Sequence, residues 1–299
     1  MRAEAIPLRP LTLAERLDAA VELLRRNAVG LISVGAVLAL VEQGLLYPLR
    51  RLADVSPPFY FDIYLRHLGA YWLLLATGLG TEAAIIAVLG GLAARAAVPA
   101  LTGRGLGGVV GSRGGLGGAV GSRAGTAPRW LAGRGSRTGP LILVALLVGV
   151  GAALTSAAGF VPWFAWYLFT GLAAPALIIE RRNPLNALGR SFVMVSRGSL
   201  RPGGNRLLGY LAWFFIRLAL AIGGVQALLF ITQLDGRGWL YAASITAWVA
   251  VNTIAYAVLG CLDAVLHLEN RMRVEGLDIA LTRALRRGAP TDRILVGER

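Results

Sequence analysis

The hydrophobic residues of this chain gather in five long stretches that carry almost no charge. These stretches are Ala28–Tyr47, Gly69–Ala93, Pro140–Ile179, Leu207–Thr232 and Trp239–Leu262. Each is long enough to cross a bilayer, since a membrane-spanning helix needs roughly 20 apolar residues. Pro140–Ile179 has room for two helices, and the run Gly159-Phe160-Val161-Pro162 can turn the chain between them. The pattern predicts six membrane spans.

The predicted fold class is all-α: a polytopic membrane bundle of six transmembrane helices with amphipathic helices at the membrane surface. Composition supports this prediction, because 15% of the residues are charged whereas a soluble domain has about 25%. The predicted membrane domain covers residues 28–267, between an amino-terminal segment of residues 1–27 and a tail of residues 268–299. Its predicted spans are residues 28–47, 69–93, 140–159, 161–179, 207–232 and 239–262.

The distribution of arginine predicts the orientation of the bundle. All 30 basic residues are arginine, and the net charge is +14. Segments 1–27, 94–139, 180–206 and 268–299 contain five, seven, six and seven arginines, and the opposite side has four. The positive-inside rule assigns the arginine-rich side to the cytoplasm, so both termini are predicted to be cytoplasmic. The use of arginine alone is typical of GC-rich bacterial genomes, and we expect a protein of the bacterial cytoplasmic membrane.

Two cytoplasmic segments have the pattern of amphipathic helices. Thr12 and Glu15 form a capping-box pattern, and the apolar residues that follow share one helical face: Leu13, Leu17, Val21 and Leu24. This helix is predicted either to lie on the membrane surface or to dock on the protein's own bundle. A second helix is predicted to start at Asn183-Pro184, with Arg190 and Ser191 off its apolar face. That apolar face consists of Leu185, Leu188, Phe192 and Val195.

Three further segments are predicted to meet the membrane surface or the cytoplasm. Trp163, Trp166 and Tyr167, and the aromatic residues within Pro48–Leu68, are expected at the interface. Residues 101–139 are rich in glycine and arginine, contain a near repeat, and predict a flexible cytoplasmic loop. Such a loop can contact nucleic acid, but anionic lipid headgroups are the favoured partner, because basic residues beside the membrane are attracted to them.

Ionisable residues inside the spans are the main candidates for a functional site, because charges in hydrocarbon are costly. The candidates are Glu42, Glu82, Arg217 and Asp263. Glu82 and Arg217 are the most deeply placed opposite charges, and they are predicted to form an ion pair. The alternatives for Glu82 are a protonated carboxyl group and a role in proton or substrate passage. Glu42 and Asp263 are expected near the interfaces, where water can reach them.

Small residues predict close packing between spans. Ala145, Gly149 and Ala153 repeat every four residues and form a ridge on the third span. Further glycines are expected to serve the same purpose: Gly78, Gly90, Gly223 and Gly224. The sequence predicts no strongly broken helix within a span.

No pattern of catalytic residues is found, so the chain is predicted not to be an enzyme. The HExxH, GxSxG and GxxxxGK[ST] motifs are absent. The two histidines, His67 and His267, are expected on opposite sides of the membrane and cannot share one metal. Cys261 is a lone cysteine and is expected to be a buried apolar residue. We therefore predict no catalytic residues, no metal site and no cofactor.

Three stretches resemble a known family: Arg9–Asn27, Pro175–Glu180 with Ala187–Ser191, and His267–Asp278. They are similar to uncharacterised multi-pass proteins of actinobacteria that are related to the membrane domain of glycerophosphoryl diester phosphodiesterase. The catalytic barrel of that enzyme has no counterpart here, so the resemblance implies no phosphodiesterase activity. It implies an ion-pair cluster at the cytoplasmic face, formed by Glu180, Arg190, Arg271, Arg273, Glu275 and Asp278.

Two functions remain open from the sequence. The first is a scaffold or accessory component of the membrane, whose partners are lipids and either other membrane proteins or a second copy of this chain. The alternative is a small transporter or channel that uses Glu82 and Arg217. A cavity that reaches Glu82 favours transport, and a solid bundle favours the accessory role.

Overall fold

The computed structural model describes residues 11–55, 67–101, 137–197, 200–232, 237–287 and 294–295. Regular structure within these ranges is α-helical, which confirms the predicted fold class. The helices are α1 (Leu13–Arg26), α2 (Ala28–Leu52), α3 (Leu68–Leu101), α6 (Thr138–Ala158), α7 (Phe160–Thr170), α8 (Ala173–Ile179), α9 (Pro184–Arg197), α10 (Arg201–Thr232), α11 (Arg237–Glu275) and α12 (Leu277–Arg286). Most of the loop at 101–139 and of the aromatic segment within Pro48–Leu68 lies outside the described residues.

Six helical stretches of the described chain are long and apolar enough to cross a membrane, which makes this a multi-pass membrane protein. They are Ala28–Leu52, Leu68–Val98, Thr138–Ala158, Phe160–Ile179, Arg201–Ile231 and Gly238–Glu275. Several are longer than the apolar pattern predicts, because the helices continue into polar sequence. The first runs to Leu52, the fifth begins at Arg201 and the sixth ends at Glu275.

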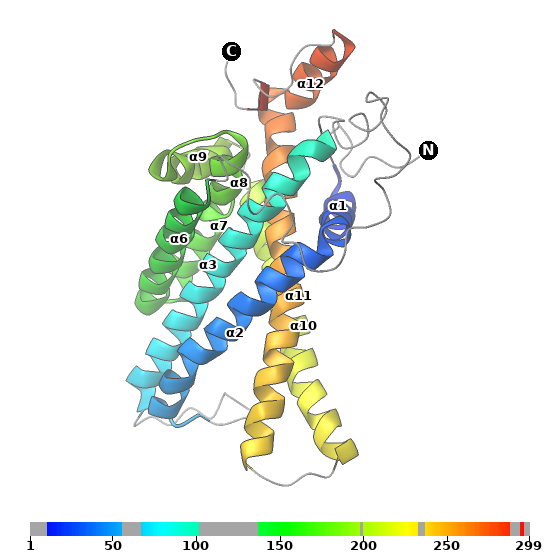
Figure 1. Cartoon of the computed structure of the whole chain (residues 1–299). Helices are drawn as coiled ribbons and strands as arrows, with labels where there is room; N and C mark the ends of the chain where they lie inside the picture. The colour runs from blue at the N-terminus through cyan, green and yellow to red at the C-terminus, as the bar shows by residue number, and fades with distance from the viewer. Residues whose placement is uncertain are drawn as a thin grey trace.

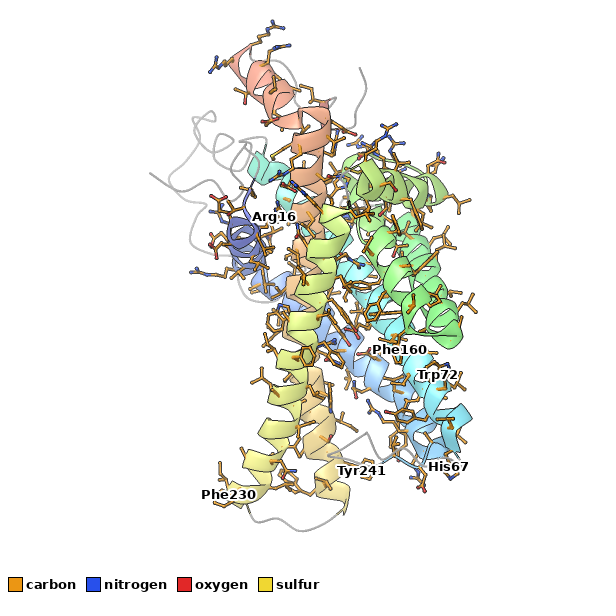
Figure 2. All side chains as sticks on the ribbon, turned by 180° about the vertical axis from the view of Figure 1, so that it is seen from behind. Arg16, His67, Trp72, Phe160, Phe230 and Tyr241 are labelled. Atoms are coloured by element: carbon orange, nitrogen blue, oxygen red, sulfur yellow. The ribbon has the colours of Figure 1, made fainter. Side chains whose placement is uncertain are left out.

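The longest helix, α11, forms the centre of the bundle, and α3 packs beside it (Figure 1). In the most apolar part of the α11 span 78% of the residues are buried, whereas in that of the α10 span 17% are buried. Helices α1, α9 and α12 lie at one end of the molecule, which we call the terminal end (Figure 1). At the opposite end the α2–α3 pair diverges from the α10–α11 pair, and His67 lies well apart from Phe230 (Figure 2).

The predicted small-residue ridge does bring two spans close together. A Cβ atom on Gly80 of α3 would lie 2.8 Å from the Cβ atom of Ala153. One on Gly149 of α6 would lie 2.9 Å from the carbonyl oxygen of Gly80. The prediction is wrong for Gly223 and Gly224, because a Cβ atom there would lie more than 4 Å from every described residue beyond the adjoining turns of its own helix.

The fourth span is broken, which the sequence analysis did not predict. The chain turns at Gly159, whose φ of 135° suits glycine, as expected. A second interruption at residues 171–172 separates α7 from α8. Ser191 of α9 satisfies the backbone there: its Oγ donates to the carbonyl oxygen of Phe169 at 2.5 Å and accepts from the amide of Leu172 at 3.1 Å.

Helix α1 begins with the predicted capping box, since Thr12 and Glu15 exchange hydrogen bonds. The helix also docks on the bundle, but not by the face that the apolar pattern indicated. Its buried residues are Arg16, Ala19, Ala20, Leu23 and Leu24. Apart from Leu24, the residues of the predicted apolar face point outward and are 40–45% exposed: Leu13, Leu17 and Val21. One face therefore contacts protein, and the other is free to contact lipid.

Helix α9 begins at Pro184 as predicted, but it too buries a different face. Its buried residues are Ala187, Ser191, Met194 and Val195. Leu185 is 71% exposed, although the apolar pattern placed it on the packed side. Ser191 is buried because it bonds the break between α7 and α8.

Two of the three aromatic residues predicted at the interface lie inside the bundle. Trp163 and Tyr167 are 2% and 1% exposed, and their rings stack with centroids 5.2 Å apart. Tyr210 of α10 packs against both rings. This aromatic cluster fills the space between α7 and α10.

Candidate functional site

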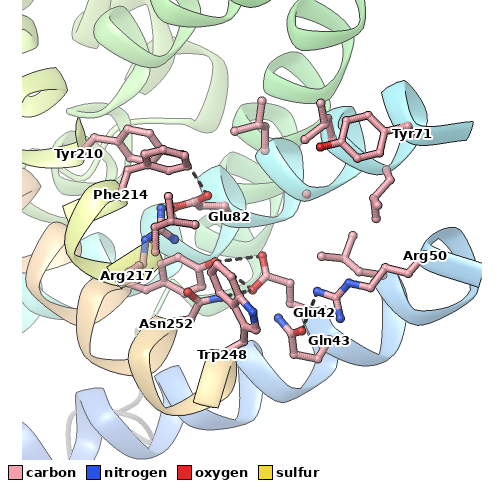
Figure 3. A pocket seen from close by; sticks show the side chains of 17 residues that line it. Glu42, Gln43, Arg50, Tyr71, Glu82, Tyr210, Phe214, Arg217, Trp248 and Asn252 are labelled. Atoms are coloured by element: carbon pink, nitrogen blue, oxygen red, sulfur yellow. Dashed lines mark hydrogen bonds and ion pairs between the residues drawn. The ribbon is translucent and has the colours of Figure 1, made fainter. Parts of the chain in front are cut away.

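A pocket of about 190 Å³ lies between α2, α3, α10 and α11 (Figure 3). Its walls are largely apolar: Leu46, Leu74, Leu75, Leu79, Phe214 and Leu218. Its floor carries the polar side chains of Glu42, Glu82, Arg217 and Tyr256. The pocket thus places charged groups at the end of an apolar chamber.

Glu82 and Arg217 form the ion pair that the sequence predicted. Arg217 Nη2 lies 2.6 Å from Glu82 Oε1. Tyr210 donates its hydroxyl hydrogen to Glu82 Oε2 at 3.1 Å. The Arg217 guanidinium also lies 5.6 Å and 5.3 Å from the ring centroids of Tyr210 and Tyr256, within cation–π distance. The pair ties α3 to α10, and both side chains line the pocket.

Glu42 lies deeper than predicted, because α2 continues past it to Leu52. It is 4% exposed, and its carboxylate accepts hydrogen bonds from Tyr256 at 2.9 Å and from Asn252 and Thr81 at 3.3 Å. Within the described residues no arginine lies within ion-pair distance of this carboxylate. The floor therefore holds two carboxylates and Arg217, while a second arginine of the pocket, Arg50, donates to Gln43 at 2.8 Å.

These groups lie near the middle of the membrane domain. Glu42, Glu82, Arg217 and Tyr256 are each close to the midpoint of their candidate span. The pocket extends from there toward Arg50 and Tyr71, at the end opposite to the terminal end. Its polar floor is thus separated from that opposite end by the pocket and from the terminal end by packed protein.

A second buried ion pair was missed by the sequence analysis. Arg206 Nε donates to Asp263 Oδ1 at 2.7 Å, and both residues are 1% exposed. Arg206 also donates to the carbonyl oxygen of Tyr167, one turn before the break in the fourth span. The sequence predicts Asp263 near an interface, within reach of water, but the residue is buried inside the bundle. Arg206 was assigned to a loop because the apolar stretch begins after it.

The predicted ion-pair cluster at the terminal end forms in part. Glu180 lies within 4 Å of His267 and of three arginines: Arg182, Arg190 and Arg271. Glu275 also pairs with Arg190 and Arg271. Partial burial lowers the pKa of the Arg190 guanidinium, but its hydrogen bonds to Glu275 and Glu180 outweigh this effect, and its pKa is raised above the ordinary value.

Two predicted members do not join this cluster. Arg273 instead pairs with Glu269, which also binds Arg16 of α1 at 3.2 Å. Asp278 lies in the first turn of α12, and none of the described residues forms an ion pair with it. The terminal end therefore has two separate ionic contacts, one that joins α8, α9 and α11 and one that joins α1 to α11.

The described residues contain no group of three or more His, Cys, Asp or Glu side chains that could hold a metal ion. Cys261 is buried among packed helices, as expected. The floor of the pocket offers hydrogen bonds and charge to a bound molecule.

No family model, no curated protein and no solved structure matches this chain. The resemblance to the membrane domain of glycerophosphoryl diester phosphodiesterase stays a prediction, carried by the three stretches that suggested it. The functional argument therefore depends on the pocket and on the charged residues around it.

Proposed function

We propose that this protein is a transporter for a small amphiphilic cation, which binds in the pocket between α2, α3, α10 and α11. One observation carries the proposal: a cavity reaches Glu42 and the Glu82–Arg217 pair near the middle of the membrane domain. A central charge costs about 2.5–3.5 kcal/mol on insertion scales, so buried charges in a span favour a functional role. The accessory role needs a solid bundle, and the pocket counts against it.

The charge of the floor supports a cationic substrate. Two carboxylates and Arg217 give the ionised floor a net charge of −1. A second arginine that lines the pocket, Arg50, bonds Gln43 instead, and within the described residues no arginine forms an ion pair with Glu42. A substrate ammonium group can supply that counter-charge. Aromatic side chains near Glu42 add to this preference, because the faces of Tyr256 and Trp248 attract organic cations.

The walls support an amphiphile rather than a small ion. Leucine and phenylalanine side chains surround most of the pocket, so the body of the substrate gains free energy from burial at about 25 cal/mol per Å² of apolar surface. Binding sites in transporters commonly lie near the bilayer midplane, which is where this floor lies. We propose that the protein performs no covalent chemistry on the substrate.

A series of probes of similar size tests this proposal. Benzyltrimethylammonium, benzyl alcohol and phenylacetate share an aromatic body and differ in charge. The cation is expected to raise the unfolding temperature of the purified full chain and to enter proteoliposomes that contain it. Glu42→Gln is expected to weaken both effects about tenfold, and Ser156→Ala on α6 is the control for a buried polar change away from the pocket. A preference for phenylacetate, or equal effects of all three probes, contradicts the proposal.

A further inference from the structure

A row of buried polar side chains continues from the pocket floor to the terminal end of the bundle. Four members lie along α11: Tyr256, Asp263, His267 and Arg271. At 1.5 Å per residue they extend about 22 Å along the helix, more than half the thickness of a bilayer's hydrocarbon core. The row begins at the proposed binding site, but most of its residues do not line the pocket.

The first step of the row leads from Glu82 to Tyr167. Tyr210 bonds Glu82, and its ring centroid lies 4.7 Å from that of Tyr167. The Tyr167 side chain is buried, and its hydroxyl makes no hydrogen bond within the described residues. The Tyr167 ring thus contacts both Tyr210, which bonds Glu82, and Arg206, which pairs with Asp263.

The second step is Asp263. Its Oδ1 atom accepts from Arg206, whose guanidinium lies 3.6 Å from the Tyr167 ring centroid. Its Oδ2 atom is buried and makes no hydrogen bond in the described part of the chain. Within the described residues, the ionisable groups that interact with Asp263 are Arg206 from α10 and Tyr167 from α7, while α3 presents Gly90.

The third step is His267, one turn further along α11. Neither ring nitrogen makes a hydrogen bond within the described residues, although Nε2 lies 3.4 Å from Glu180 Oε1. The surrounding charges in the described chain are Glu180 and Arg182 just after α8, Arg190 from α9, and Arg271 and Glu275 from α11. Glu180 connects to Arg190, which is only partly buried, so the row ends near the surface.

Buried polar atoms without partners are rare, because each costs free energy unless a protein group or an ordered water bonds it. Within the described residues, three members of the row contribute four such atoms: Tyr167 Oη, Asp263 Oδ2, His267 Nδ1 and His267 Nε2. We propose that this row binds internal water and conducts protons between the pocket and the terminal end, with Asp263 and His267 as the proton-binding residues. A proton passes from the pocket carboxylates to Asp263, then to His267, and leaves beside Glu180, so that every group returns to its starting state.

The geometry also couples protonation to the shape of the bundle. Arg206 holds Asp263 with one nitrogen and the Tyr167 carbonyl with another. Protonation of Asp263 removes the charge that Arg206 pairs with, which weakens the hold of α10 on the broken fourth span. Proton binding can therefore bias the position of α7 relative to α8, which is a coupling that a proton-driven transporter needs.

A charge-displacement measurement tests the row without any substrate. The full chain is reconstituted on a solid-supported membrane, and a pH step is applied on one side. The wild-type protein is expected to give a transient current as protons enter the row. Asp263→Asn and His267→Gln are expected to lower the displaced charge at least twofold, and Ser156→Ala is expected to leave it unchanged.

Tyr167→Phe keeps the test clear if Asp263→Asn fails to fold. The Tyr167 hydroxyl bonds none of the described residues, so its removal is expected to leave the unfolding temperature unchanged while reducing the displaced charge at least twofold. Wild-type displaced charge in Tyr167→Phe and His267→Gln overturns the proposal, as does the absence of any current in the wild-type protein. Benzyltrimethylammonium is absent throughout, so failure of cation binding and failure of proton conduction are separate results.

Discussion

Two buried arginines on α10, Arg217 and Arg206, each pair with one carboxylate, yet their surroundings differ. Arg217 and its partner Glu82 line a pocket. Arg206 and its partner Asp263 are enclosed by protein, and Arg206 also bonds the backbone at the break in the fourth span. An arginine–carboxylate pair thus lines a pocket in one region and holds helices together in the other. Burial alone does not distinguish the roles of the two ion pairs. The presence or absence of a pocket beside each pair does.

The largest expected effect is the difference in stability lost when each of the two arginines is replaced. Arg206→Met leaves Asp263 as an uncompensated buried charge, which should cost about 3–5 kcal/mol. Arg217→Met should cost less, about 1–3 kcal/mol, because Glu82 keeps its bond from Tyr210 and lies beside the pocket. Thermal unfolding in mild detergent measures both. Equal losses would remove the distinction, and the double variant Arg206→Met with Asp263→Leu should recover part of the stability.

Glycine substitutions test the enclosed region next. A Cβ atom on Gly171 would overlap the Arg206 side chain, so Gly171→Ala should cost about 1–3 kcal/mol through overpacking. Gly223→Ala is the matched control, because its added methyl group would contact no other helix of the described chain. Alanine within a helix should stabilise that variant by up to about 1 kcal/mol. The unfolding temperature should fall for the first and not for the second.

Glu82→Gln tests the pocket side of the comparison. The glutamine can still accept from Tyr210, and Glu42 can balance the charge of Arg217, so the yield of folded protein should stay near that of wild type. Binding of benzyltrimethylammonium should weaken about tenfold, because the floor loses a negative charge. A poor yield of folded protein, with wild-type affinity in the fraction that folds, would assign Glu82 a structural role only.

The smallest effect is expected on the outer face of α1. Leu17 is 40% exposed and points away from the bundle, so Leu17→Ser should change the free energy of unfolding in detergent by no more than about 0.5 kcal/mol. The same variant should be less stable in anionic vesicles if this face contacts lipid. The variant Ala20→Ser, on the buried face of the same helix, provides the comparison in both environments.

The sequence allows the spans and one ion pair to be predicted, because length, apolarity and depth are local properties. Glu82 and Arg217 were both placed deep in apolar stretches, and a buried charge needs a partner. The Arg206–Asp263 pair could not be found in this way, because α10 begins at Arg201, before its apolar stretch. The break at residues 171–172 gives no signal either, since apolar residues look the same in a continuous and an interrupted helix.

The sequence also does not determine which side chains of a helix face the protein interior. Trp163 and Tyr167 have the composition of interfacial residues, yet they pack inside against Tyr210. Ser191 lies off the apolar face of α9, but it is buried because it bonds a backbone break that only the three-dimensional arrangement creates. In both cases a contact with a distant helix determines the position, and no local pattern encodes that contact.

Labelling of a single cysteine in the pocket tests the central claim most directly. Gly78 lines the pocket, and within the described part of the other helices only Leu46 lies within 4 Å of an added Cβ atom. Gly78→Cys should react with a membrane-impermeant thiol reagent from one side of a sealed vesicle, and benzyltrimethylammonium should slow the reaction. The natural Cys261, buried away from the pocket, serves as the unreactive reference. If Gly78→Cys is as unreactive as Cys261, or if the cation leaves its rate unchanged, the pocket does not bind cations from water and the account is contradicted.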